Sequence, residues 1–300
     1  MRIGTALPQF GPLAEPHLVA GFAVEAERMG YDALWAADRA LTPLQPSEIY
    51  PGCTPEQPWP VEQARSVDPI VTLTAAAAVT TRVRLATSTL DAPWHTPLLL
   101  GRSLTSLDLL SQGRLDIGFG VGWMRSEYEA LGVPWSGRGA RLEEILDVFQ
   151  AMWTSDPVEH QGKLWQIPPS RMDLRPFQKP GPPVLLAGFV AGALDRIGRR
   201  GDGWLPVTVV GDGPDLETLE GPWQVIKQRA EVAGRDPSVL RRELRVNIAP
   251  GHPVESAVPV LQSARELGYD GAFLDLTYNA DSVDHALKIA ADIVERYRKG

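Results

Sequence analysis

The chain has 300 residues, 44% of them hydrophobic and 22% charged, a composition typical of a globular protein that buries a large core. Its net charge of −8 and the lack of a basic, aromatic-rich run argue against a nucleic-acid partner. A single cysteine, Cys53, excludes an intramolecular disulfide, and the sequence shows neither a signal-peptide pattern nor a membrane-spanning apolar run. We therefore expect a cytoplasmic protein with no membrane partner.

Short apolar runs alternate with amphipathic helical segments along the chain, the order typical of parallel strands joined by crossover helices. We predict strands at Ile3–Leu7, Ala33–Ala36, Val83–Thr87, Leu115–Gly118, Val184–Ala187, Gly203–Val207, Leu244–Ile248 and Gly271–Asp275. We predict helices at Glu15–Met29, Pro69–Val79, Leu98–Ser111, Arg138–Trp153, Ala191–Arg200, Trp223–Ala233, Pro253–Leu267 and Asp281–Arg298. Eight strand–helix pairs in series predict an α/β fold, a closed (β/α)8 TIM barrel that forms a single domain over residues 1–300.

Two proline-rich segments, at about 39–66 and 155–183, interrupt this alternation. Neither can form one continuous helix, because proline lacks the backbone N–H group that a helix interior needs. The first segment follows the second strand, so it leaves the barrel from the face where active sites of this fold lie. The second precedes the fifth strand, so part of it can wrap the outside, with His160–Ile167 as a candidate hairpin.

The glycine-rich ends of two predicted strands are candidate ligand sites. Gly118, Gly120 and Gly122 stand at alternate positions, which lets a ligand approach the backbone closely. The alternative is a tight turn at the rim of the barrel. Small residues over Ala187–Gly192 connect the fifth strand to a helix whose N-terminal amide groups can bind an anion. Close packing of that strand against the helix is the alternative reading.

Polar side chains also stand at the predicted mouth of the barrel. Asp38 and Arg39 end the second strand, and Ser88, Thr89 and His95 follow the third. A carboxylate and an imidazole at this face are candidates for proton transfer, although a lone histidine is more often a packing or surface residue. The five histidines are scattered without the spacing of metal ligands, so we expect no metal.

Taken together, these motifs resemble the bacterial luciferase-like superfamily, and within it the branch that uses the deazaflavin coenzyme F420. The most specific matching positions are Ser106–Arg114, Gly118, Gly120, Gly122, Trp123, Glu127, Gly132, Arg138, Arg141, Glu144, Trp153 and Gly201–Trp204. The resemblance covers nearly the whole chain. It implies a luciferase-like barrel that is usually dimeric, so we expect a homodimer.

The resemblance also implies where a cofactor binds, with its ring in the barrel mouth and its phosphate-bearing tail over the glycine-rich strand ends. The resemblance assigns the ring to Gly120, Gly122 and Trp123. It assigns the bulge behind the ring to Ser88 and Thr89. It assigns the phosphate to Ala187, Gly188, Phe189 and Val190. In the family, the bulge often holds a cis peptide bond that does not involve proline.

One departure from the family pattern affects the expected chemistry. Family members commonly end the second strand with Ser-Asp-His, whereas this chain has Ala37, Asp38 and Arg39. Arginine stays protonated and cannot act as a base, but it can stabilise an anionic ring or clamp an acidic substrate. His95 is then the replacement candidate for proton transfer. Trp123 stands where sugar-phosphate-oxidising members carry a glutamate, so we do not expect that activity.

The resemblance implies an oxidoreductase that transfers a hydride between F420 and an unidentified small-molecule substrate, with Asp38, Arg39 and His95 as the candidate catalytic residues. A monooxygenase that uses reduced FMN and oxygen is the alternative, because it shares the fold and most of the phosphate site. Family monooxygenases tend to be longer than 300 residues, which favours the F420 reading. The loss of the family histidine leaves open a third reading, a barrel that binds a cofactor without catalysis.

Overall fold

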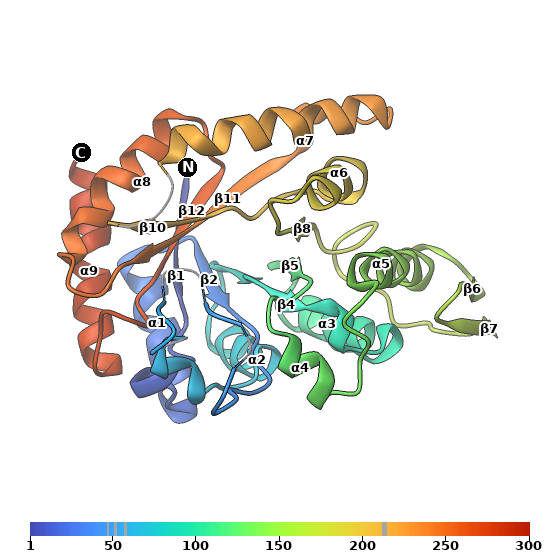
Figure 1. Cartoon of the computed structure of the whole chain (residues 1–300), viewed down its shortest axis with the longest axis horizontal. Coiled ribbons are helices and arrows are strands. Elements are labelled where there is room, and N and C mark those ends of the chain that lie inside the picture. The colour runs from blue at the N-terminus through green and yellow to red at the C-terminus, as the bar shows by residue number, and fades with distance from the viewer. Residues whose placement is uncertain (47, 51–52, 57–58, 212–214) are drawn as a thin grey trace.

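A parallel sheet closes on itself in the middle of the molecule (Figure 1). The computed structural model describes residues 1–46, 48–50, 53–56, 59–211 and 215–300. The barrel strands are β1 (Arg2–Ala6), β2 (Ala33–Ala36), β3 (Arg84–Thr87), β4 (Leu90–Asp91), β5 (Leu115–Gly120), β8 (Val184–Leu186), β9 (Gly203–Trp204), β10 (Val207–Val210), β11 (Arg241–Ile248) and β12 (Gly271–Asp275).

The closure of the barrel depends on a strand that is made of two pieces. β9 pairs in parallel with β8 on one side and with β11 on the other, and β10 continues alongside β11. The strands on the rest of the path run in parallel in the order β11, β12, β1, β2, β3, β5 and β8, with β4 as a short extension that pairs with β5. The predicted TIM barrel is therefore confirmed.

Aromatic and aliphatic side chains fill the interior of the barrel. The rings of Trp35 and Phe273 stack at 4.4 Å between centroids, and both side chains are buried. Their neighbours in this inner cluster are Ala33, Ala86, Leu185 and Leu205. Because Ala33 and Ala86 are small, they leave room for two large rings in the barrel interior.

Charged side chains occupy the N-terminal ends of the strands. The Asp116 carboxylate of β5 accepts hydrogen bonds from Arg84 Nε at 2.5 Å and from Arg241 Nη2 at 2.8 Å. β5 and β11 are not neighbouring strands, so this contact crosses the barrel interior. Arg2 of β1 pairs with Glu243 of β11 in the same region. We call these five residues the barrel floor.

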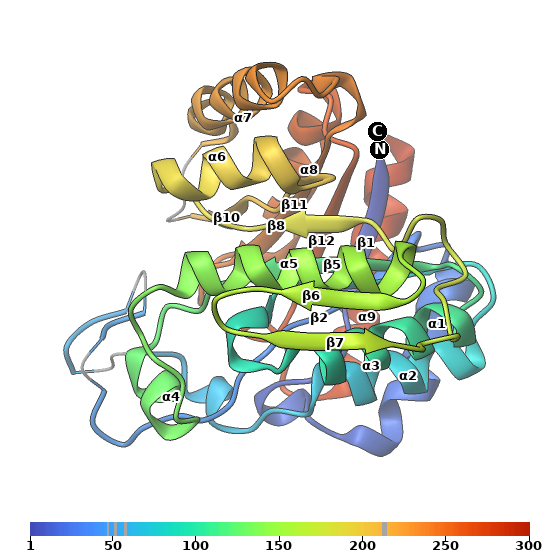
Figure 2. The same cartoon turned by 90° about the vertical axis from the view of Figure 1, so that its right-hand side faces the viewer.

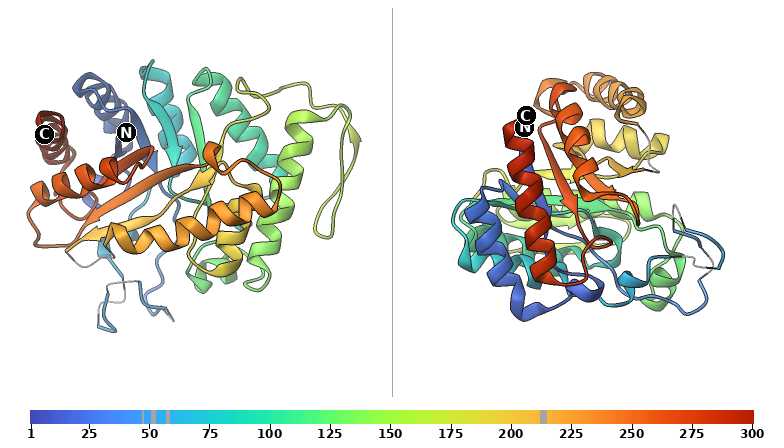
Figure 3. Two further views of the ribbon diagram at one scale, coloured as in Figure 1. Left: turned by 90° about the horizontal axis from the view of Figure 1, so that it is seen from above. Right: turned by 90° about the vertical axis from the view of Figure 1, so that its left-hand side faces the viewer.

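Helices surround the sheet (Figure 3). They are α1 (Val19–Met29), α2 (Pro69–Val79), α3 (Pro97–Leu110), α4 (Arg125–Ala130), α5 (Arg138–Thr154), α6 (Ala191–Arg200), α7 (Glu220–Val232), α8 (Ala257–Glu266) and α9 (Val283–Lys299). The pairs that pack against each other include α1 with α2, α2 with α3, α3 with α5, α6 with α7, α8 with α9, and α9 with α1. The main hydrophobic core lies between these helices and the barrel. In the part of the chain that the structure describes, no helix is both long and apolar enough to cross a membrane.

The two proline-rich segments lie in different places. In Figure 2, the described parts of 39–66 lie at the left with α4, at the end of the molecule opposite the two termini. They contain one short 3-10 helix, Val61–Ala64, while residues 47, 51–52 and 57–58 are outside the described part. Within 155–183, β6 (Val158–Gln161) and β7 (Gln166–Ser170) form the expected hairpin, which lies along the outside of α5.

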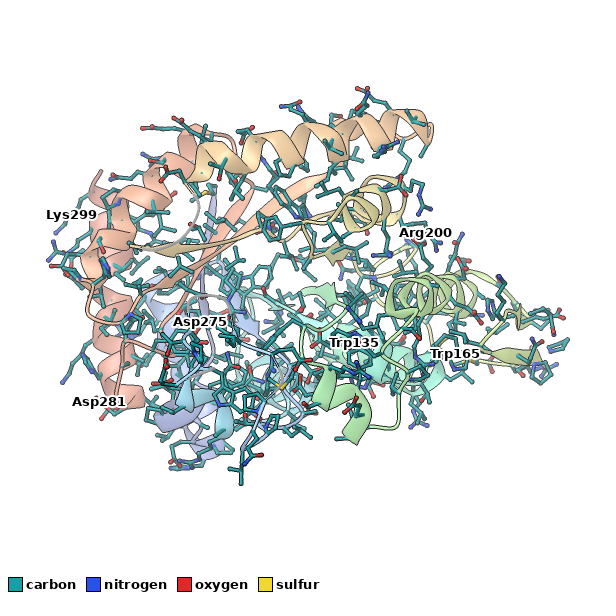
Figure 4. The ribbon with its side chains drawn as sticks, viewed as in Figure 1. Trp135, Trp165, Arg200, Asp275, Asp281 and Lys299 are labelled. Carbon is teal, nitrogen blue, oxygen red and sulfur yellow. The ribbon has the colours of Figure 1, made fainter. Side chains whose placement is uncertain are left out.

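One carboxylate holds this hairpin against α5. Glu144 accepts backbone N–H hydrogen bonds from Leu164 at 2.9 Å and from Trp165 at 2.8 Å. The guanidinium group of Arg141, on the same helix, lies 4.6 Å from the centre of the Trp165 ring, which Figure 4 places at the edge of α5. The hairpin is thus fixed to the outer surface by charge-assisted hydrogen bonds.

Candidate active site

A cavity of about 270 Å³ lies at the C-terminal ends of the strands. The predicted site residues that line it are Asp38, Arg39, Ser88, Thr89, Gly120, Gly122, Trp123, Ala187 and Gly188. Three predicted residues, His95, Phe189 and Val190, lie beside the cavity and do not line it. Among the described residues, no cluster of His, Cys, Asp or Glu side chains could hold a metal ion.

A chain of polar contacts connects the cavity to solvent. Asp38 lines the cavity, and its Oδ2 atom lies 3.5 Å from Nε2 of His95. The His95 side chain is 36% exposed, against 10% for Asp38. The same Oδ2 atom accepts the backbone N–H of Asp91 at 3.3 Å. His95 therefore has access to solvent, and it reaches the cavity only through Asp38.

Asp91 is a buried carboxyl group in the same wall. Burial and the neighbouring charge of Asp38 raise the pKa of Asp91, and the charge of Arg39 only partly opposes them. A carboxyl group with a raised pKa keeps its proton to a higher pH than an exposed one, and in its protonated form Asp91 has an O–H group that can donate a hydrogen bond. The sequence places the Asp91 carboxylate at this face, between Ser88 and His95, but we did not count Asp91 among the candidate site residues.

Arg39 is held in a buried ion pair. Its Nη1 atom donates to Oε2 of Glu127 on α4 at 3.0 Å, and the two side chains are 7% and 0% exposed. Glu127 Oε1 also accepts the backbone N–H of Ala40 at 2.8 Å, and the Arg39 guanidinium lies 5.1 Å from the Trp123 ring centre. Because Glu127 balances its charge, Arg39 is not a free cation, which argues against one of the two roles that the sequence left open for it, the clamp for an acidic substrate.

The bulge behind the expected ring position is present. The peptide bond between Ser88 and Thr89 is cis, as the family resemblance implied. A side chain at Gly120 would place its Cβ only 2.4 Å from Oγ1 of Thr89, so only glycine lets these two strand ends approach so closely. The carbonyl oxygen of Ser88 accepts a hydrogen bond from Nη1 of Arg245 at 2.9 Å.

Arg245 is a functional candidate that sequence reasoning missed. It lines the cavity from β11, pairs with Asp275 at 2.5 Å through Nη2, and donates through Nε to Asn247 at 3.1 Å. Burial works against the charge of Arg245, but the Asp275 carboxylate, together with the hydroxyl groups of Tyr50 and Tyr278, raises its pKa. Asp275 is at the end of β12, in the interior of the molecule (Figure 4). The sequence does contain a signal for Arg245, because polar residues stand at the alternate positions 243, 245 and 247 of one strand and therefore point to the same face of the sheet.

The proline-rich segment 39–66 shapes the remaining wall. Tyr50 lines the cavity and packs edge-on against Trp123, with 5.2 Å between ring centres. Gln63 comes from the short 3-10 helix and donates through Nε2 to the hydroxyl oxygen of Tyr278 at 3.1 Å. Described residues of this segment therefore form part of the cavity wall, at the face of the barrel where its position after the second strand placed it.

The start of α6 offers free backbone donors beside Gly188. The N–H groups of Ala193 and Leu194 bond to the carbonyl oxygen of Val190, whereas those over 189–192 have no partner among the described residues. Gly188 has φ +135°, and a Cβ there would lie 2.5 Å from that of Ala193. The chain thus turns sharply from β8 into a helix N-terminus that can bind a phosphate.

The fold and this cavity define a TIM barrel with its candidate site at the C-terminal mouth. The family model described as luciferase-like monooxygenase matches residues 1–297, and the chain belongs to that family. An uncharacterized protein of Mycobacterium tuberculosis is 31% identical over 212 residues, which cover 70% of this chain and 73% of that protein. The F420-dependent glucose-6-phosphate dehydrogenase of Amycolatopsis mediterranei is 28% identical over 256 residues, which cover 83% of this chain and 69% of that enzyme.

Two solved structures share the fold over nearly the whole chain. The monooxygenase RslO1 from Streptomyces bottropensis has a TM-score of 0.77 at 20% identity, over 100% of this chain and 98% of the other. An F420-dependent secondary alcohol dehydrogenase, in complex with an F420–acetone adduct, has a TM-score of 0.77 at 17% identity, over 99% of both chains. At these identities the likeness shows the fold alone.

Proposed function

We propose that the protein is an oxidoreductase that transfers a hydride between coenzyme F420 and a small organic substrate. The observation that carries the proposal is the unpartnered N-terminus of α6 at the rim of the cavity, next to Gly188 and opposite the cis Ser88–Thr89 bond. This arrangement fits a flavin-like ring with a phosphate-bearing tail. Relatives that are named F420-dependent support the choice of cofactor.

In this proposal, different residues of the chain bind the cofactor and transfer the proton. Gly120, Gly122 and Trp123 would flank the ring, and the amides after Gly188 would hold the phosphate. When bound, F420 supplies the donor or acceptor of a hydride. The proton that leaves or joins the substrate oxygen would pass through Asp38, which lines the cavity, to the partly exposed His95.

A monooxygenase that uses reduced FMN and oxygen is the second candidate. The description of the matching family and the fold shared with RslO1 favour it. Glucose 6-phosphate, on which the Amycolatopsis relative acts, is not our proposed substrate, because both arginines of the cavity wall already pair with carboxylates.

A titration with both cofactors tests the proposal. Purified protein is titrated with oxidised F420 and, separately, with FMN, and quenching of cofactor fluorescence is followed. We expect F420 to be quenched with micromolar affinity and FMN to bind more weakly. Tight FMN binding without F420 quenching would contradict the proposal and favour the monooxygenase. Turnover with either cofactor excludes a barrel that only binds.

A further inference from the structure

Two guanidinium groups are the only permanent cations among the described residues that line the cavity. Arg39 pairs with Glu127 at 3.0 Å, and Arg245 pairs with Asp275 at 2.5 Å. All four side chains are buried or nearly so, with exposures between 0% and 18%. In such a setting an ion pair holds its charges together firmly, because water does not screen them. Neither guanidinium is therefore free to neutralise a bound anion.

The remaining charge in the wall is negative. The carboxylate of Asp38 has His95 as its neighbour at 3.5 Å, and the two balance only when that imidazole is protonated. Asp91 lines the same wall, and its carboxyl group carries no positive charge whether or not it is protonated. The wall formed by the described residues is thus neutral or negative, and a phosphate or carboxylate group in the cavity would lose its hydration without gaining a cation.

The same wall offers hydrogen-bond donors to uncharged oxygen atoms. A guanidinium group has five N–H donors, and the bonds of Arg245 to Ser88, Asn247 and Asp275 use three of them. The hydroxyl oxygen of Tyr278 accepts from Gln63, so its own O–H group can donate. These donors suit the oxygen of a hydroxyl or carbonyl group, which needs hydrogen bonds and no counter-ion.

We propose that the cavity takes an uncharged substrate that carries a hydroxyl or carbonyl oxygen, and that the pairing of Arg39 with Glu127 keeps anionic substrates out. This inference rests on the proposed function for its site, and it names the substrate class of that site. It concerns the charge of the wall, so it can be tested by binding alone, with or without cofactor.

Two probes that share a ring and differ in charge test the inference. Binding of cyclohexanol and of cyclohexanecarboxylate is measured by saturation-transfer NMR, on the F420-loaded protein and on the protein without cofactor. In the wild type we expect cyclohexanol to bind and the carboxylate to bind at least about tenfold more weakly, since it meets no free cation. Equal binding of the two probes, or no binding of cyclohexanol, overturns the inference.

A single substitution should reverse the preference. Glu127→Gln keeps the shape of the side chain and its acceptor for Ala40, but it releases the charge of Arg39. We expect the affinity for cyclohexanecarboxylate, relative to cyclohexanol, to rise about tenfold. Glu129→Gln is the matched control on the same helix, because the Glu129 side chain is 62% exposed and pairs with Arg125. This control should leave the ratio unchanged.

The outcomes separate this inference from the proposed cofactor. A folded Glu127→Gln protein, judged by circular dichroism, whose probe ratio equals that of the wild type overturns the role of the Arg39 pair. If Glu127→Gln does not fold, the wild-type comparison of the two probes still decides the substrate class. Failure of F420 to bind contradicts the proposed function, whereas the probe comparison without cofactor then stands by itself.

Discussion

Replacement of Glu243 by glutamine should make the stability of the protein less sensitive to a rise in pH from 4.5 to about 7. Glu243 lies in the barrel floor and its side chain is 5% exposed. Burial raises its pKa from 4.5 to about 7, and the attraction of Arg2 and Arg241 only partly opposes burial. Because its pKa is higher in the folded than in the unfolded state, Glu243 stabilises the folded protein when it is protonated. This contribution to the free energy of unfolding is fully present below pH 4.5 and is lost as the pH rises through about 7. The difference corresponds to a loss of about 3 kcal/mol, as an upper limit.

Urea unfolding at several pH values measures this effect. The free energy of unfolding of Glu243→Gln minus that of the wild type should increase by up to about 3 kcal/mol between roughly pH 4 and pH 9. The subtraction removes the other titrating groups, which both proteins share. Glu129→Gln, at an exposed site, should give a difference that does not change with pH. Parallel curves for Glu243→Gln and the wild type would refute the buried, raised pKa.

Two further predictions concern the cofactor and the proton. At Gly188, where φ is +135°, replacement by alanine should weaken F420 binding through strain against Ala193. Replacement by aspartate should weaken it more, because the added charge repels the phosphate. Equal dissociation constants of the two variants for F420 would place the phosphate elsewhere. In His95→Gln, the turnover rate should fall because Asp38 loses its proton path to solvent. Added imidazole should restore part of the turnover rate. An unchanged rate in the variant would remove His95 from the mechanism.

The barrel could be predicted from the sequence because its signals are local. The bounds of β2, β12, α2 and α6 agree with those predicted, since each is a short buried run or an amphipathic segment between clear turn residues. The sixth strand was predicted as one piece, but it is divided into β9 and β10 around Pro206, which has no N–H group to donate to a neighbouring strand. Helix α4 was missed because six residues are too few to show helical periodicity.

The electrostatics of the site could not be predicted in the same way. Arg39 and Glu127 are 88 positions apart in sequence, and Arg245 and Asp275 are 30 apart. Their pairing depends on how strand ends and loops meet at the mouth of the barrel, which no local pattern records. The sequence did identify Asp38, Arg39 and the glycines as residues of the mouth. It could not show that the charge of Arg39 is already balanced.

The stacked pair of Trp35 and Phe273, together with the barrel floor, has a kinetic consequence. These side chains fill the barrel beneath the cavity, so the described interior offers no rear exit. A cofactor and a substrate that both bind in the cavity would therefore enter and leave through the same opening, at the mouth of the barrel. The molecule that lies deeper would have to bind first and leave last. A saturating concentration of the outer molecule would then prevent the inner one from leaving. For the proposed reaction between a cofactor and a substrate, we therefore expect compulsory-order kinetics, with inhibition by an excess of the reactant that binds second.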